Sequence, residues 1–97
     1  MKKVNVKSIR KGNYVKISKK EGNIDNKYWT TTYLKVKRKR GENVFSDKWV
    51  DFNSKGKFIN VFTVIDGVED CSIFKVYKLS KKEYYQKVGK YLIIWRL

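Results

Sequence analysis

The side chains best suited to bind an anionic polymer are concentrated in residues 28–40, where aromatic, β-branched and basic residues follow one another. In an extended strand every second side chain points to the same side. One face would then carry two aromatic rings followed by three lysines, in the order Trp29, Thr31, Tyr33, Lys35, Lys37 and Lys39. Bases stack on such rings at about 1–3 kcal/mol each, while lysines pair with phosphates. The spacing therefore predicts a platform for single-stranded nucleic acid, with an ordinary edge strand as the alternative.

Five of the six residues at positions 35–40 are basic, namely Lys35, Lys37, Arg38, Lys39 and Arg40. Such a run at the end of a strand predicts a phosphate clamp, and the alternative is a solvated turn. Because neighbouring residues of a strand point to opposite sides, Lys39 and Arg40 can meet one nucleic-acid strand only if the segment twists. The N-terminal segment is also basic, and Lys11 and Lys16 are assigned to the same predicted surface.

The charge of the whole chain supports an anionic partner. Its 97 residues include 24 lysines and arginines against nine acidic residues, which gives a net charge of +15. A hydrophobic content of 41% excludes a disordered polycation, so the charge belongs to a folded domain whose self-repulsion a polyanion would relieve. Only four of the basic residues are arginine. Because lysine is a point charge, whereas arginine reads guanine edges through two hydrogen bonds, the composition favours contact with phosphates over sequence readout.

We therefore expect a small basic nucleic-acid-binding protein, with single-stranded DNA or RNA as the first choice of partner and the backbone of a duplex as the second. Two other classes remain open. One is a histidine-free RNA-cleaving protein of the toxin type, and the other is a module that docks on an acidic protein. A membrane surface and solubility alone also explain a basic surface, and exposed aromatic residues and strand edges are compatible with a homodimer.

Catalysis is poorly supported, because the chain has no histidine and so lacks the usual general base and the Ser-His and Cys-His dyads. Asp66, Glu69 and Asp70 surround a turn and meet the carboxylate requirement of a Mg²⁺-dependent nuclease only loosely. The single cysteine, Cys71, excludes an internal disulfide and the Cys₂His₂ and Cys₄ zinc sites. We expect no catalytic residues, no metal and no cofactor.

No signal-peptide-like run opens the sequence, and no segment approaches 18 consecutive apolar residues. Together with the single thiol, this predicts a soluble protein of the cytoplasm.

Glycine-containing turns divide the chain into short segments with period-2 alternation, which predicts strands at residues 28–38, 44–52, 58–65 and 69–79. In residues 28–38 the core face would consist of Tyr28, Thr30, Thr32, Leu34 and Val36. Asp66-Gly67 is a strong two-residue hairpin signal, so residues 58–65 are expected to pair with residues 68–77.

One helix is expected near the C-terminus. Ser80 and Glu83 match the S-x-x-E capping box, and Gly89 is placed to end the helix. The apolar run of residues 91–97 then predicts a buried closing strand. The fold expected is a single β-rich α+β domain over residues 1–97. It has five or six short, mainly antiparallel strands in a partial or closed small barrel, and one short helix at about residues 80–89.

The segment Ile9-Arg10-Lys11-Gly12-Asn13-Tyr14-Val15-Lys16-Ile17 combines a hydrophobic residue, a Gly-polar turn and an alternating strand. In this it resembles the opening segment of SH3-like small barrels. The resemblance covers nine residues and implies a small barrel, SH3-like or OB-like, rather than a particular activity.

Overall fold

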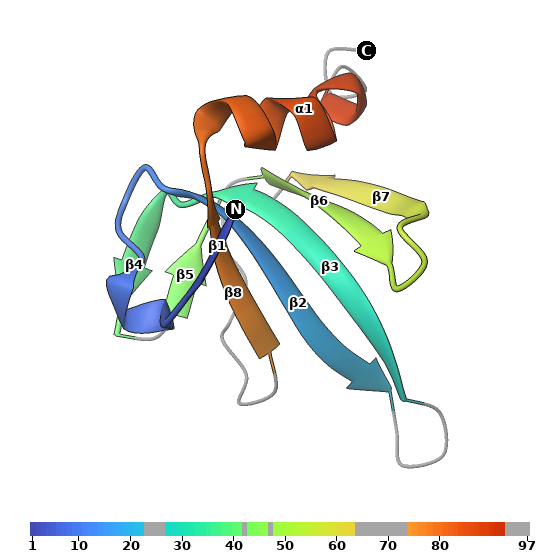
Figure 1. Cartoon of the computed structure of the whole chain (residues 1–97), viewed down its shortest axis with the longest axis horizontal. Helices are drawn as coiled ribbons and strands as arrows, with labels where there is room; N and C mark the ends of the chain where they lie inside the picture. The colour runs from blue at the N-terminus through green and yellow to red at the C-terminus, as the bar shows by residue number, and fades with distance from the viewer. Residues whose placement is uncertain (23–26, 42, 47, 64–73, 93–97) are drawn as a thin grey trace.

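In the computed structural model, which describes residues 1–22, 27–41, 43–46, 48–63 and 74–92, a six-stranded antiparallel sheet is covered at one end by a single helix (Figure 1). The elements are β1 (Lys2–Val4), a 3₁₀ turn (Val6–Ser8), β2 (Tyr14–Gly22), β3 (Lys27–Lys35), β4 (Arg38–Arg40), β5 (Asn43–Phe45), β6 (Lys48–Asn53), β7 (Phe58–Thr63), β8 (Phe74–Leu79) and α1 (Lys81–Leu92). The β-rich fold with one C-terminal helix is confirmed.

The sheet is open rather than closed into a barrel. Its strand order is β1-β8-β2-β3-β6-β7, so β1 and β7 form its two edges within the described part of the chain, while β4 and β5 form a separate two-stranded sheet. Of the two forms expected, a partial or a closed barrel, the closed barrel is therefore wrong. Closure is one way to bury the faces of a sheet, and here α1 and the β4–β5 hairpin cover them instead (Figure 1).

One face of the sheet packs into a core made mainly of β-branched residues. Thr30, Thr32 and Leu34 of β3 lie on it, as the alternation predicts, and Val36, directly after β3, is buried as well. Residues from β2, β8, β5 and the N-terminal turn complete this cluster, which consists of Ile9, Val15, Ile17, Leu34, Val36, Val44 and Val76.

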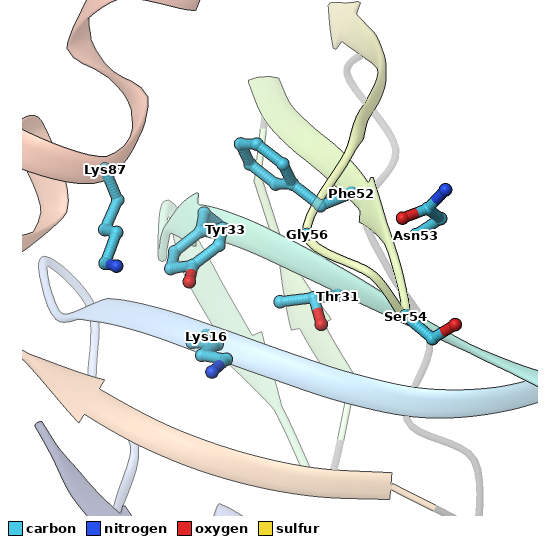
Figure 2. Close-up of a pocket in the computed structure, with 8 residues that line it drawn as sticks. All are labelled: Lys16, Thr31, Tyr33, Phe52, Asn53, Ser54, Gly56 and Lys87. Carbon is cyan, nitrogen blue, oxygen red and sulfur yellow. The ribbon is translucent and has the colours of Figure 1, made fainter.

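The other face of the sheet is covered in part by α1. Tyr84 and Val88 are buried, and they lie four residues apart on the helix, as the sequence predicts for its docking stripe. Beneath them, Tyr33 of β3 and Phe52 of β6 lie beside each other with ring centroids 5.5 Å apart (Figure 2). The helix thus turns one part of this face into a second, aromatic core.

The pairing of β7 differs from the prediction. β7 pairs with β6, whereas β8 pairs with β1 and β2, and three strands lie between β8 and β7 in the sheet. The β6–β7 turn is stabilised locally, because the Asn53 side-chain oxygen accepts hydrogen bonds from the Lys55 and Lys57 backbone N–H groups and Gly56 has a φ of +78°. β8 is placed by burial of Val76 beside Ile17. Asp66-Gly67 lies outside the described residues.

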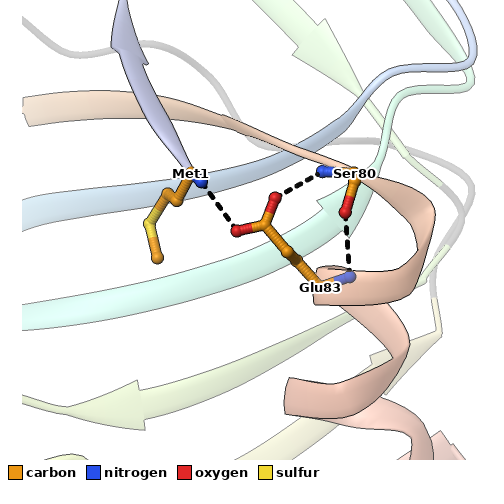
Figure 3. A network of polar contacts seen from close by, with 3 residues as sticks. All are labelled: Met1, Ser80 and Glu83. Atoms are coloured by element: carbon orange, nitrogen blue, oxygen red, sulfur yellow. Dashed lines mark hydrogen bonds and ion pairs between the residues drawn. The ribbon is translucent and has the colours of Figure 1, made fainter.

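The start of α1 follows the capping-box prediction. The Glu83 N–H donates to the Ser80 hydroxyl (3.1 Å), and the Ser80 N–H donates to the Glu83 carboxylate (2.9 Å). The other carboxylate oxygen of Glu83 accepts from the N-terminal ammonium of Met1 at 2.7 Å, which ties β1 to the helix (Figure 3).

The end of α1 differs from the prediction, since the helix continues through Gly89 to Leu92. Gly89 is not among the glycines with positive φ, so it does not act as a left-handed cap. The extra turn places the Tyr91 ring parallel to that of Phe58, with centroids 4.5 Å apart. This packing explains why Tyr91 and Leu92 are helical rather than part of a closing strand. Residues 93–97 lie outside the described residues.

We predict that Ser80→Ala lowers the free energy of unfolding by about 1 kcal/mol, because the N–H of Glu83 loses its capping oxygen. Urea denaturation followed by circular dichroism measures this. The exposed Ser54, whose hydroxyl makes no hydrogen bond within the described residues, provides the control Ser54→Ala, which should change stability little. Equal effects of the two changes would contradict the capping role.

Glu83 also predicts a pH dependence. Hydrogen bonds from the N-terminal ammonium and from the Ser80 N–H lower the pKa of Glu83 from 4.5 to about 2. A lowered pKa means that the charged form stabilises the fold above pH 4.5 and that this contribution is lost as the pH falls toward 2. Glu83→Gln should retain the cap and lose this dependence. The difference in unfolding free energy between the two proteins should therefore shrink from pH 5 to pH 2, and a constant difference would contradict the assignment.

Candidate functional site

Lysines from three elements meet at a cleft of about 410 Å³ beside the start of α1. We call it the basic cleft, and its lining residues are Lys11, Gly12, Lys35, Val36, Lys37, Lys48 and Tyr85. Lys11 precedes β2, Lys35 ends β3 and Lys48 begins β6. The sheet brings these positions together although 37 positions separate the first from the last in the sequence.

Backbone hydrogen bonds position Lys11 beside the end of β3. The Gly12 N–H donates to the Val36 carbonyl at 2.8 Å, and the Val36 N–H donates to the Asn13 carbonyl at 2.8 Å. Gly12 has a φ of +88°, a conformation that favours glycine. The Asn13 side-chain oxygen also accepts from the Arg10 N–H at 2.7 Å, which closes the turn. The loop is therefore anchored at both ends, and Lys11 is exposed at its tip.

Tyr85 provides the aromatic side of the basic cleft. It is 46% exposed, an unusual exposure for a large aromatic side chain on a helix that covers a sheet. Its ring contacts those of Tyr14 and Tyr84 in edge-on geometry, with centroids 5.9 and 5.2 Å apart. Lys35 lies close by, with its ammonium 5.7 Å from the centre of the Tyr14 ring. The cleft thus combines a supported, half-exposed tyrosine with several cations.

A second hollow lies on the open part of the same sheet face. It consists of two neighbouring cavities of about 260 and 350 Å³, both lined by Thr31 and Ser54. We call it the sheet groove. Its lining residues are Lys16, Ser18, Thr31, Tyr33, Phe52, Asn53, Ser54, Gly56, Lys75, Tyr77 and Lys87. In Figure 2, Lys87 reaches from α1 toward the sheet, and the Tyr33 hydroxyl points toward the strand that carries Lys16.

The two hollows lie on opposite sides of α1. Tyr85 and Lys87 flank the stripe formed by Tyr84 and Val88, which faces the sheet, because successive helical residues are rotated by about 100°. Tyr85 therefore belongs to the basic cleft and Lys87 to the sheet groove.

Within the sheet groove, Lys16 extends over the Tyr77 ring, with its ammonium 5.2 Å from the ring centre. The Ser18 and Thr31 hydroxyl oxygens face each other at 3.5 Å. Burial raises the pKa of Tyr33, so its hydroxyl stays protonated at neutral pH and can donate a hydrogen bond. The groove therefore offers both cations and neutral hydrogen-bonding groups.

The predicted site residues separate into groups. Lys11, Lys35 and Lys37 come together at the basic cleft, and Lys16 lies in the sheet groove. The remaining basic residues lie on β4: Arg38 stacks over the Phe45 ring at 4.5 Å, Arg40 is exposed, and the Lys39 ammonium donates to the Val6 carbonyl at 2.7 Å. Lys39 therefore ties β4 to the N-terminal turn.

The predicted platform along residues 29–39 is wrong in two respects. Tyr33 is only 7% exposed, because α1 covers this part of the face and Phe52 packs against its ring. The alternation also ends at Lys35, since the Lys37 N–H donates to the Phe45 carbonyl and the chain passes from the large sheet into β4. Trp29 of β3 pairs with Lys20 of β2, and the structure does not describe its side chain.

The sequence analysis does not assign Lys48, Lys87 or Tyr85 to the candidate site. The 3.6-residue period was a usable signal for Tyr85, because it sets this residue beside the buried stripe rather than in it. Nothing local marks Lys48, which reaches the cleft only through the pairing of β6 with β3.

The described residues include no group of three or more histidine, cysteine or acidic side chains that could hold a metal ion. Within the same part of the chain, no helix has the length and apolar character needed to cross a bilayer.

The burial of Tyr33 leads to a stability prediction. Tyr33→Ala should lower the free energy of unfolding by about 3–5 kcal/mol, because it leaves a cavity beside Phe52 and Val50. Tyr33→Phe keeps the ring and should lower the free energy of unfolding much less. Thermal denaturation of both variants measures the difference. An exposed platform residue would instead tolerate alanine with little loss, which would contradict the core assignment.

The candidate site thus consists of two hollows beside one helix, one lined mainly by lysines and the other by lysines and hydroxyl groups. Comparison with protein families, curated proteins and solved structures found no match to this chain.

Proposed function

We propose that this protein binds single-stranded nucleic acid, with phosphates held by the lysines of the basic cleft and a base stacked on Tyr85. The observation that carries the proposal is the convergence of Lys11, Lys35 and Lys48 from separate elements beside a half-exposed tyrosine.

Electrostatics favours an anion at this cleft. Lysines gathered on one concave surface repel one another, and low-dielectric walls concentrate their field. The net charge of +15 adds to this repulsion throughout the molecule. An anion with several charges relieves it and releases its own counterions on binding, which is how nucleic acids gain affinity for basic surfaces.

The chemistry of the cleft favours single strands over duplexes. Stacking on Tyr85 requires an unpaired base, since in a duplex the faces of the bases are already stacked on one another. Lysine rather than arginine supplies the cations of the cleft, which suits phosphate contact more than reading of base edges. α1 has 12 residues and packs on the sheet through Tyr84 and Val88, so a role as a major-groove reading helix is disfavoured.

The proposal predicts strong salt dependence. If about four to six phosphates are contacted, the logarithm of the binding constant should fall against the logarithm of salt concentration with a slope of about −3 to −5. Fluorescence polarisation with a labelled single-stranded oligonucleotide measures this slope. Absence of binding at about 50 mM salt, or a slope near zero, would contradict the proposal.

Variants separate the contribution of phosphate contacts to binding from that of base stacking. Lys35→Gln or Lys11→Gln should weaken binding of all sequences alike and make the slope shallower by about one unit. Tyr85→Ala should weaken the free energy of binding to single strands by about 1–3 kcal/mol, because one stacked base is lost. It should leave the slope of the binding constant against salt concentration nearly unchanged.

The matched control is Lys2→Gln on β1, an exposed lysine that lines neither hollow. If Lys2→Gln lowered the affinity for the oligonucleotide as much as Lys35→Gln does, binding would depend on net charge alone. The basic cleft would then not be the binding site.

A further inference from the structure

The sheet groove differs in chemistry from the basic cleft. Besides three lysines it is lined by six neutral residues whose side chains can form hydrogen bonds, namely Ser18, Thr31, Tyr33, Asn53, Ser54 and Tyr77. The basic cleft has only one such neutral side chain, that of Tyr85. A ligand that needed charge alone would be served by the basic cleft, so the additional hydroxyl groups indicate a ligand with hydrogen-bonding groups of its own.

Most of these hydroxyl groups are available to a ligand. Between the described residues, no hydrogen bond forms to the side-chain hydroxyl of Tyr33, Ser54 or Tyr77. Ser18 and Thr31 face each other at 3.5 Å, which is long for a hydroxyl pair. Each hydroxyl can both donate and accept a hydrogen bond. A ligand group that can also do both therefore satisfies more of its hydrogen-bonding capacity than a group that only donates or only accepts.

RNA has such a partner in every nucleotide. The phosphate oxygens accept hydrogen bonds and attract lysines, and the 2′-hydroxyl both donates and accepts, which lets a protein distinguish RNA from DNA. Deoxyribose lacks that hydroxyl. Lysines and hydroxyl groups side by side, as at Lys16 and Tyr33 or at Lys75 and Ser18, therefore complement a ribose–phosphate backbone.

We propose that the sheet groove binds the ribose–phosphate backbone of RNA and that the protein consequently prefers RNA to DNA of the same sequence. This inference rests on the proposed function and extends it from the basic cleft to a second contact. Because α1, about 10 Å across, separates the groove from the cleft, only a strand of several nucleotides can occupy both.

The test compares a twelve-nucleotide oligouridine with oligodeoxyuridine of the same length, which differ only in the 2′-hydroxyl groups. Fluorescence polarisation at one low salt concentration gives both dissociation constants. The ribo-oligomer should bind about five- to tenfold more tightly. Thr31→Val and Tyr33→Phe, which remove only hydroxyl groups, should each weaken the ribo-oligomer about threefold and leave the deoxy-oligomer unchanged, as expected for one lost hydrogen bond.

Tyr85→Phe is the matched control, because it removes the same group from a tyrosine outside the sheet groove. It should leave the ratio of the two dissociation constants unchanged. Equal binding of the two oligomers by the wild type, or equal weakening of both by Thr31→Val, would overturn the inference. In that case a salt-dependent loss caused by Lys35→Gln would still support the proposed function. Binding of neither oligomer would overturn both.

Discussion

The packing of α1 across one half of the sheet is the interaction on which the other functional features depend. Tyr84 and Val88 bury the helix against the sheet, and Tyr91 adds a stacked contact with Phe58 at its far end. This docking converts the covered half of the face into an aromatic core. It leaves the remaining half open as the sheet groove, and it fixes Tyr85 and Lys87 on opposite sides of the helix.

The distribution of charge follows from the same packing. Two cores, one on each side of the sheet, take up the apolar side chains, and the lysines of the basic cleft lie at the end of β3, at the start of β6 and in connecting segments. Because the start of β2, the end of β3 and the start of β6 lie near one another, the lysines at or beside these positions share one cleft rather than spreading over the surface. The cost is electrostatic repulsion in a small domain, which a polyanionic ligand would offset.

Features set by local chemistry could be predicted from the sequence. The capping box at Ser80 and Glu83 needs only four consecutive residues, and the structure forms it as expected. The alternation in residues 28–38 likewise identifies the core face containing Thr32, Leu34 and Val36. Gly89 shows the limit of local preference, because tertiary packing of Tyr91 outweighs the tendency of glycine to end a helix.

Features set by long-range pairing could not be predicted. Alternation shows which residues share a face but not which part of that face a distant helix will cover, so Tyr33 was placed on the surface although it is buried. The strand order is equally non-local, since β8 pairs between β1 and β2 rather than beside β7. The gathering of Lys11, Lys35 and Lys48 depends on that order, and composition alone indicated only that a basic surface exists somewhere.

The most direct measurement is an amide chemical-shift map of the isotope-labelled protein during titration with a short single-stranded oligonucleotide. We expect the largest shifts at Lys11, Gly12, Lys35 and Tyr85, with further shifts at Thr31 when the oligonucleotide is long enough to reach the sheet groove, and little change in β1. Shifts confined to β1 or to the β4–β5 hairpin, with none around Tyr85, would contradict the assignment of the nucleic-acid interface to the two sides of α1.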